Sequence, residues 1–199
     1  MFYETARRDH GLPHDPIKAI VAPRPIGWIS TLSEDGVANL APYSFFNLVS
    51  TRPDIVAFSS DGLKHTVRNI LATREFVCNL ATLELIEAVN LTSKPVKPDE
   101  SEFDLAGLMP APSRLIAPPR VAASPCALEC VWIDTLELKD QHGDATGTHL
   151  TLGEVLGVHI DEAFIEDGLL RTEKLHSLGR DGYFDYSWVD AVRSVPRPR

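Results

Sequence analysis

Residues 23–47 read PRPIGWISTLSEDGVANLAPYSFFN, and this stretch decides the fold. Apolar runs flank Asp35-Gly36, a dipeptide that favours a tight turn between two antiparallel strands. We therefore expect Ile17–Leu32 to form a first strand, and Asn39–Ser50 to return as a second strand that is interrupted at Ala41-Pro42 and pairs with the first. Residues near 30 would then lie opposite residues near 41, and Pro42 would place the returning strand at a sheet edge or a bulge.

The rest of the chain continues as short strands with a few helices. Apolar spacing predicts helices over Lys64–Arg74 and Leu83–Leu91. Further strands are expected at four ranges: Asp54–Ser59, Glu75–Leu80, Ala127–Leu138 and Thr148–Ile160. Seven prolines between Thr92 and Pro125 predict an irregular excursion, and the aromatic segment 178–186 is turn-like. These features indicate a mainly β protein, an antiparallel barrel with added helices, in one domain over residues 1–199 with its core at about 15–186.

Composition and charge narrow the function classes. Hydrophobic residues make up 44% and charged residues 24%, as in soluble globular proteins. The net charge of −9 argues against nucleic acid or an anionic membrane as partner. Without a signal-peptide pattern or a long apolar run, the chain is expected to be cytoplasmic. Three cysteines, Cys78, Cys126 and Cys130, fit reduced thiols better than a disulfide or zinc ligands, so no metal site is expected. Rossmann and P-loop glycine motifs are absent from the sequence.

The segment 59–66, SSDGLKHT, has the pattern of a phosphate site. A strand ends, a glycine permits a turn, and a helix begins whose first amides lack internal acceptors and favour an anion. Lys64 would add a charge, and Ser59, Ser60 and Thr66 would add hydroxyl donors. Taken alone, however, the same residues fit an ordinary helix cap with a solvated lysine.

A second cluster follows the two strands joined by Asp35-Gly36. Paired strands offer backbone amides and carbonyls to the polar edge of a flat heteroaromatic ring, and small Ala41 with rigid Pro42 leaves room for that ring. Taken singly, Trp28 and Tyr43 also fit core aromatics, and Asn39 a turn residue. The members of the cluster are Trp28, Ser30, Thr31, Asn39, Ala41, Pro42, Tyr43 and Ser44.

These segments together resemble the flavin reductase-like family. The resemblance is carried over about residues 15–186 by the stretches at 24–31, 35–47, 64–70, 102–108, 129–130, 153–155 and 179–183. More narrowly, the chain resembles the branch that contains flavoredoxin and the reductase components of nitrilotriacetate monooxygenases. The resemblance implies a split β-barrel, a homodimer and bound FMN.

The resemblance, together with the phosphate pattern of segment 59–66, predicts which residues contact FMN. These are Trp28, Ser30, Thr31, Asn39, Leu40, Ala41, Pro42, Tyr43, Ser44, Ser59, Ser60, Lys64, His65, Thr66 and Arg180. Two departures stand out. His65 replaces the acid of the family's Lys-Asp-Thr, and Gly147-Thr148-His149 lacks the middle acid of the Gly-Asp-His motif by which short-chain relatives contact nicotinamide. Two interpretations of His149 therefore stay open: a residue that binds NAD(P)H, or an ordinary histidine at the end of a strand.

The leading hypothesis is an FMN-dependent oxidoreductase, an NAD(P)H:flavin reductase that supplies reduced flavin or electrons to a monooxygenase or another redox partner. Because the flavin carries the redox chemistry, no catalytic acid, base or nucleophile is required of the chain. One alternative is an FMN-binding electron carrier without a nicotinamide site, and another is a heme- or pyridoxal-linked relative on the same barrel. A homodimer is expected, with Tyr183 and Phe184 reaching the partner's flavin.

Overall fold

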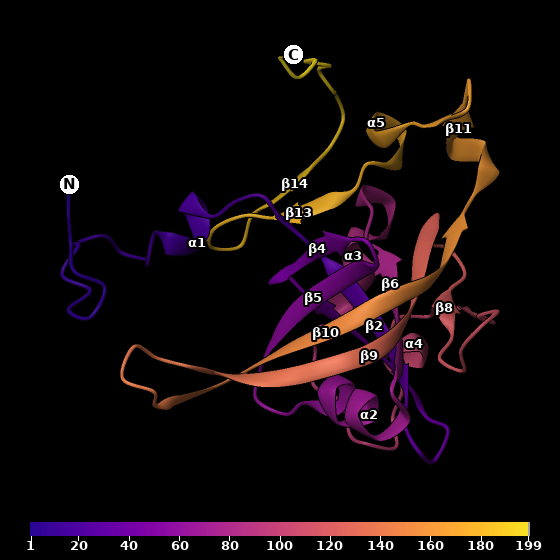
Figure 1. The fold of residues 1–199 in the computed structure, drawn as a ribbon, viewed down its shortest axis with the longest axis horizontal. Coiled ribbons are helices and arrows are strands. Elements are labelled where there is room, and N and C mark those ends of the chain that lie inside the picture. Colours follow the sequence, from indigo (N-terminus) through magenta and orange to yellow (C-terminus); the bar gives the residue numbers. More distant parts are fainter. Residues whose placement is uncertain (199) are drawn as a thin grey trace.

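The fold is built on one seven-stranded antiparallel sheet, seen here in a computed structural model that describes residues 1–198 (Figure 1). The strand order is β3-β2-β6-β9-β10-β5-β4. Only Ser44 and Phe45 separate β3 from β4, yet these two strands lie at opposite edges of the sheet, so the sheet must curl round on itself. The strands are β2 (Gly27–Leu32), β3 (Ala38–Tyr43), β4 (Phe46–Thr51), β5 (Asp54–Asp61), β6 (Glu75–Leu80), β9 (Cys126–Lys139) and β10 (Ala145–Ile160).

The predicted hairpin at Asp35-Gly36 is confirmed. Gly36 has a φ of 83°, the left-handed conformation that glycine adopts without strain, and Ile29 lies opposite Ala41. Pro42 lies inside β3, and β3 is an edge strand, as a proline within a strand requires.

Two of the predicted strand boundaries were wrong. Ile17–Ile20 forms the short helix α1, Arg24–Pro25 forms a separate short strand, β1, and β2 begins only at Gly27. The returning strand passes through Ala41-Pro42 without the expected interruption, stops at Tyr43 rather than at Ser50, and is followed by β4, which begins at Phe46 on the other edge.

The helices lie close to their predicted positions. Helix α2 (His65–Thr73) buries Val67 and Ile70 against the sheet and ends at Arg74, whose φ of 67° is left-handed. The predicted helix at 83–91 is a 3₁₀ turn, η1 (Leu83–Leu85), followed by α3 (Ile86–Leu91). The proline-rich excursion is irregular apart from α4 (Glu102–Leu105), β7 (Pro110–Ala111) and β8 (Arg120–Val121).

The two faces of the sheet carry two separate hydrophobic clusters, because side chains alternate along each strand. Ile29 points into one cluster, with Phe58 and Phe76, under α2. Trp28, its neighbour in sequence, points into the other cluster, with Val89 of α3 and Phe103 of α4. Register thus decides which residues of β2 and β3 face α2.

Segments near the two ends of the chain pair beside the barrel, although the termini themselves lie apart (Figure 1). Strand β1 (Arg24–Pro25) pairs with β13 (Leu178–Arg180), which pairs with β14 (Tyr186–Trp188). Gly182 lets the tail loop lie close to Ala19 of α1, because a Cβ at position 182 would lie only 2.5 Å from Ala19 Cβ. The N-terminal segment and the β9–β10 hairpin project from the same side of the barrel (Figure 1). The remaining elements are η2 (Glu162–Phe164), β11 (Ile165–Glu166), β12 (Leu169–Leu170) and α5 (Thr172–Leu175).

Among residues 1–198, none of the helices has the length and apolar character needed to cross a membrane.

Candidate functional site

A pocket of about 350 Å³ opens where α2 begins, and we call it the α2 pocket. Asn39, Ala41 and Tyr43 form one wall, because alternate residues of β3 point to the same face. The start of α2 and the segment after α3 form the rest. The other lining residues are Leu63, Lys64, His65, Thr66, Arg68, Thr92, Ser93, Lys94, Pro95, Val96 and Glu102.

The N-terminus of α2 is open toward this pocket. Lys64 is the N-cap residue in extended conformation, and no side chain among the described residues caps the helix. The amides of His65 and Thr66 therefore have no intrahelical acceptor and lie at the positive end of the helix dipole. Gly62, with a φ of 77°, makes the turn that leads into the helix. This end of α2 has the donors and the polarity that an anion needs.

Three cations surround the pocket, namely Lys64, Arg68 and Lys94. Within residues 1–198, none of the three forms an ion pair with a carboxylate. The pocket is therefore locally positive in a chain whose net charge is −9. Such a field attracts anions to this pocket although the protein as a whole is acidic.

A buried polar network holds the β3 wall. The Asn39 side-chain amide donates to both carboxylate oxygens of Glu102, at 2.8 and 2.7 Å, and the Leu40 backbone amide donates to Glu102 at 2.9 Å. The Asn39 carbonyl oxygen accepts from the hydroxyls of Thr66, at 2.8 Å, and Thr31, at 3.3 Å. Asn39 is 6% exposed and Glu102 4%. Because every polar atom of the Asn39 side chain has a partner, the network fixes its orientation.

Tyr43 stays protonated in this wall. Burial raises the pKa of its phenol and outweighs the hydrogen bonds with Thr66 and Ser60, which lower it. The hydroxyl therefore acts as a neutral hydrogen-bonding group rather than as a charged base.

Four of the predicted FMN contacts do not line the α2 pocket: three point to the opposite face of the sheet, and one is buried in the Asn39 network. Trp28 and Ser30 lie on the opposite face of the sheet, where Trp28 Nε1 donates to Thr92 Oγ1 at 2.9 Å and Ser30 Oγ donates to the Pro119 carbonyl at 2.6 Å. Leu40 packs in the same cluster as Trp28. Thr31 faces α2 but is fully buried within the Asn39 network. Strand alternation is the reason, since a contiguous motif on a strand sends every second side chain to the far face.

The other predicted residues lie around the barrel without lining the α2 pocket. Ser60 Oγ is buried and donates to the Gly62 carbonyl at 2.9 Å. Arg180 lies over the Tyr186 ring, 4.3 Å from its centre, and holds the tail loop. His149, on β10, has Nδ1 3.2 Å from the Gly147 carbonyl oxygen. Pro42, Ser44 and Ser59 are half-buried along β3, at the turn after it and on β5.

Sequence reasoning missed several residues of the pocket, namely Glu102, Arg68 and the segment 92–94. Glu102 lies in the stretch 102–108 that carried the family resemblance, yet nothing in the sequence ties it to Asn39, 63 residues away. A buried glutamate that follows Ser101, the N-cap residue of a short helix, reads from sequence as part of an ordinary helix start.

Comparisons with known proteins agree with this architecture. The family model described as "Flavin reductase like domain" matches residues 21–179. The chain belongs to the flavin reductase-like family. An uncharacterized protein of Aquifex aeolicus is 34% identical over 172 residues, 83% of this chain and 84% of that protein.

Solved structures extend this result to the branch of the family. Nitrilotriacetate monooxygenase component B from Bacillus cereus superposes with a TM-score of 0.89 and 26% identity over 98% of both chains. Flavoredoxin of Desulfovibrio vulgaris (Miyazaki F) has a TM-score of 0.77 and 21% identity over 87% of this chain and 90% of that one, which shows a shared fold. The predicted family, its branch and the split β-barrel are confirmed.

Proposed function

We propose that this flavin reductase-like protein is an FMN-dependent oxidoreductase that takes electrons from NAD(P)H and supplies reduced flavin or electrons to a partner such as a monooxygenase. The observation that carries the proposal is the α2 pocket, where an uncapped helix N-terminus and three cations without ion pairs surround a rigid polar wall. Membership of the family supports a flavin as the anion that fills it.

The residues at the helix start fit the phosphate of FMN. Lys64 and Lys94 would neutralise its charge, and the amides of His65 and Thr66 would donate to its oxygens. His65, which stands where the family's acid would be, removes a negative charge from beside the phosphate. This departure strengthens the anion site.

The β3 wall fits the flat part of the cofactor. Ala41 is small, and Tyr43 offers a neutral hydroxyl beside it. Bound FMN would supply the hydride-accepting ring, while the chain positions and shields it. Of the wider predicted set, we propose that Ser44, Ser59, Ser60 and Pro42 border the cofactor. Trp28, Ser30, Thr31 and Leu40 would position the strands that hold it.

A second candidate is an FMN-binding electron carrier without a nicotinamide site. Two observations on His149 favour it. His149 does not line the α2 pocket, and its segment Gly147-Thr148-His149 lacks the acid of the nicotinamide motif. A shared fold with flavoredoxin is compatible with this candidate.

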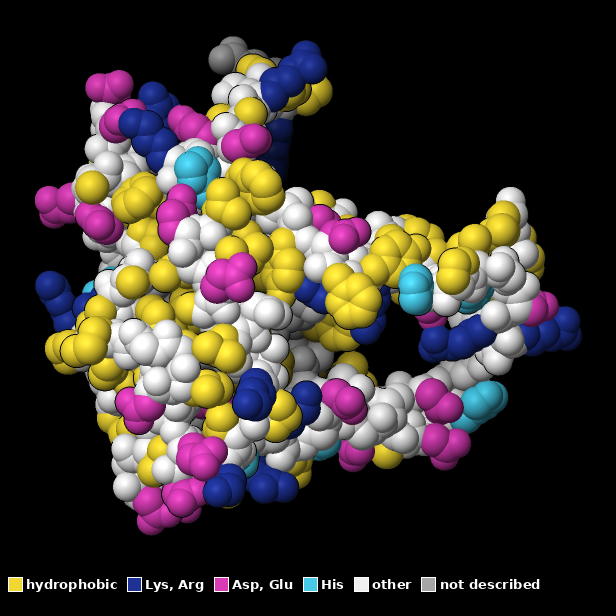
Figure 2. Space-filling model, turned by 180° about the vertical axis from the view of Figure 1, so that it is seen from behind, with side chains coloured by type: hydrophobic (Ala, Val, Ile, Leu, Met, Phe, Trp, Pro, Cys, Tyr) yellow, Lys and Arg dark blue, Asp and Glu magenta, His cyan; other side chains and the backbone are white. Residues whose placement is uncertain are grey.

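We also propose that the protein is a homodimer. Leu48 and Val49 on the edge strand β4 are 50% and 56% exposed, and Leu156 and Val158 on β10 are 47% and 60% exposed. Hydrophobic side chains cover much of the barrel surface in Figure 2. A second copy would bury this apolar surface. Light scattering that reports only monomer at working concentration would contradict the dimer.

Anaerobic stopped-flow absorbance separates the two functions. The protein is loaded with FMN and mixed with NADH or NADPH, and flavin bleaching is followed at about 450 nm. Rapid bleaching supports the reductase. Bleaching by dithionite alone supports the carrier. Failure to bind FMN at high micromolar concentration in calorimetry would refute both.

A further inference from the structure

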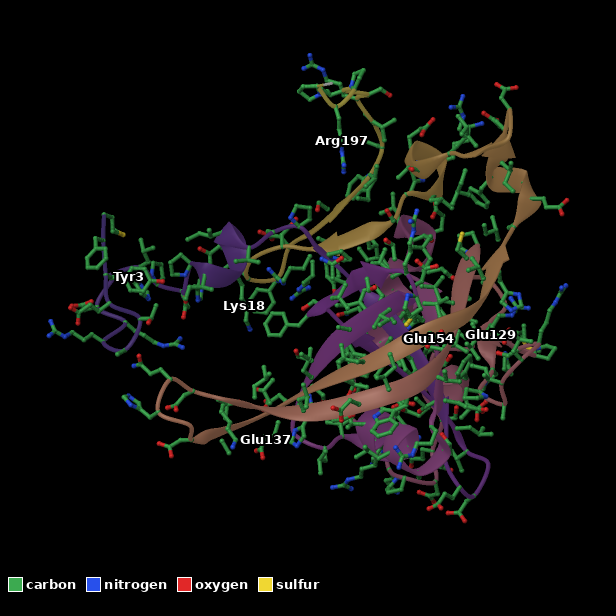
Figure 3. The ribbon with its side chains drawn as sticks, in the orientation of Figure 1. Tyr3, Lys18, Glu129, Glu137, Glu154 and Arg197 are labelled. Carbon is green, nitrogen blue, oxygen red and sulfur yellow. The ribbon has the colours of Figure 1, made fainter. Side chains whose placement is uncertain are left out.

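A second cavity, of about 590 Å³, lies between the N-terminal segment, the turn after β3 and the tail loop, and we call it the Phe45 pocket. It shares no lining residue with the α2 pocket. Its walls include Lys18, Arg24, Phe45, Tyr183 and Phe184. In Figure 3, Lys18 lies between the N-terminal segment and the barrel.

The Phe45 pocket carries an uncompensated positive charge. Arg24 is 7% exposed, and its guanidinium donates only to the backbone carbonyls of Lys18, Val21 and Asp181. Among the side chains of residues 1–198, Arg24 Nε is the one buried nitrogen or oxygen without a hydrogen-bond partner. The carbonyls pair with the two terminal nitrogens of Arg24, leave Nε unpaired and leave the charge uncompensated. A buried charge without a counter-ion is costly.

The other charged side chains of the Phe45 pocket do not neutralise this positive charge. Arg8 pairs with Asp15, while Lys18 forms no ion pair within the described part of the chain. Lys18 and Arg24 therefore give the pocket two positive charges with no carboxylate against them. This stands out in a chain with a net charge of −9.

Aromatic rings lie next to these cations. Lys18 Nζ lies 6.0 Å and Arg24 Cζ 5.9 Å from the centre of the Phe45 ring, which is 52% exposed. Tyr183 and Phe184 are 46% and 85% exposed. Figure 2 shows hydrophobic and basic side chains side by side at the root of the N-terminal arm.

The tail side of the pocket is held in place. Tyr183 has a φ of 58°, a left-handed conformation that is strained for a side chain of this size. Arg180 donates to the Tyr183 carbonyl at 3.0 Å and to the Phe184 carbonyl at 3.4 Å. His14 lies against the Tyr183 ring, with centres 5.4 Å apart. The aromatic edge is thus positioned before any ligand arrives.

We infer that the Phe45 pocket is a second small-molecule site, which binds a planar aromatic acid. The aromatic ring of the ligand lies against Phe45 and the tail aromatics, and its carboxylate or phosphate group lies at Lys18 beside Arg24. The cavity has the size of a small-molecule site. An aromatic anion would stack on its exposed rings and would also neutralise its unpaired positive charge. This site goes beyond the proposed FMN site and does not depend on it, and it assigns Tyr183 and Phe184 to this cavity instead of to the partner's flavin.

Two sources carry this chemistry: a free aromatic acid, and the nicotinamide mononucleotide half of a dinucleotide, with its phosphate close to its ring. The inference is tested by calorimetry on the full chain with 2-naphthoate as the probe, with nicotinamide mononucleotide as a second arm. Neutral 2-naphthamide and non-aromatic cyclohexanecarboxylate are the controls. We expect at least one of the two aromatic acids to bind about tenfold more tightly than either control. The arm that binds identifies the source. Equal binding of 2-naphthoate and 2-naphthamide, or no binding of either aromatic acid, would overturn the inference.

Variants then locate the site. Lys18→Gln and Phe45→Leu should each weaken the bound aromatic acid about five- to tenfold. Lys94→Gln, at the rim of the α2 pocket, is the matched control and should leave it unchanged. An equal loss in Lys94→Gln would place the ligand in the α2 pocket, and competition by FMN that responds to Lys18→Gln would assign this cavity to the flavin. Either result refutes a second site, and neither depends on whether FMN is reduced by NAD(P)H.

Discussion

The α2 pocket and the Phe45 pocket are both cationic places on an acidic chain, but they are assembled differently. The α2 pocket takes its polar wall from β3 and the start of α2, which are anchored in the barrel and locked by the buried Asn39 network. The Phe45 pocket joins the N-terminal segment to a tail loop more than 150 residues later, through Arg24, which donates to the Asp181 carbonyl and pairs with Arg180 in the β1–β13 ladder. A rigid scaffold defines the first, whereas contacts between chain ends define the second, so perturbations should separate them.

The largest effect is expected from Glu102→Ala. This change leaves two buried donors, the Asn39 side-chain amide and the Leu40 backbone amide, without an acceptor. An unsatisfied buried donor costs about 1–3 kcal/mol, so the free energy of unfolding should fall by about 3 kcal/mol. Urea denaturation measures the loss. Asp104→Ala, an exposed site on the same helix, is the control, and an equal loss there would mean that α4 itself matters rather than the network.

Lys64→Ala should distinguish the two cationic pockets by ligand. If Lys64 contacts the FMN phosphate, its loss costs about 1.5–3 kcal/mol, which weakens FMN about ten- to hundredfold. Riboflavin, which lacks the phosphate, should be nearly unaffected. Fluorescence titration measures both dissociation constants.

Lys18→Ala serves as the matched control for this measurement. It should leave the FMN dissociation constant unchanged, because Lys18 lies in the other pocket. Equal losses for FMN and riboflavin in Lys64→Ala would show that Lys64 supports the fold rather than the phosphate.

Gly182→Ala should damage the Phe45 pocket alone. A Cβ at this position would lie 2.5 Å from Ala19 Cβ and 2.8 Å from Ala19 Cα, so the tail loop must move away from α1. Overpacking of this kind costs about 1–2 kcal/mol, and the affinity for the aromatic acid should fall while that for FMN holds. Calorimetry with each ligand checks the split. Parallel loss of both affinities would mean that the two pockets are not independent.

The smallest effect concerns Glu129, which belongs to neither pocket and ties the excursion to β9. Burial raises the pKa of this carboxyl, but hydrogen bonds from His159 and from the backbone amides of Arg114 and Leu115 outweigh it and lower the pKa overall. A lowered folded-state pKa stabilises the protein above the unfolded value of about 4.3, and this stability is lost as the pH falls toward the folded pKa.

Glu129→Gln should therefore cost about 1 kcal/mol at neutral pH, and less as the pH falls below about 4.3. Thermal unfolding across this pH range measures the difference between the two proteins. Glu137→Gln, at an exposed site on the same strand, is the control. A constant difference at every pH would show that the Glu129 charge is not what stabilises the fold.

The sequence by itself determined the local structure and the family. Asp35-Gly36 set the hairpin because only some residues accept the backbone angles of a tight turn, and apolar spacing set α2. The segment 59–66 marked a helix start with a lysine, and that start lies at the α2 pocket. Each of these features depends on residues that are close together in the chain, so it can be predicted from the sequence alone.

Only the tertiary structure decided which side chains meet. Strand register sent Asn39 toward α2 and Trp28 away from it, although both lie in stretches that carry the family resemblance. Glu102 reaches Asn39 across 63 residues, and Arg24 reaches the Asp181 carbonyl across 157. Such contacts arise when distant segments bury apolar surface together, and their partners are chosen by packing of the whole barrel rather than by any local pattern.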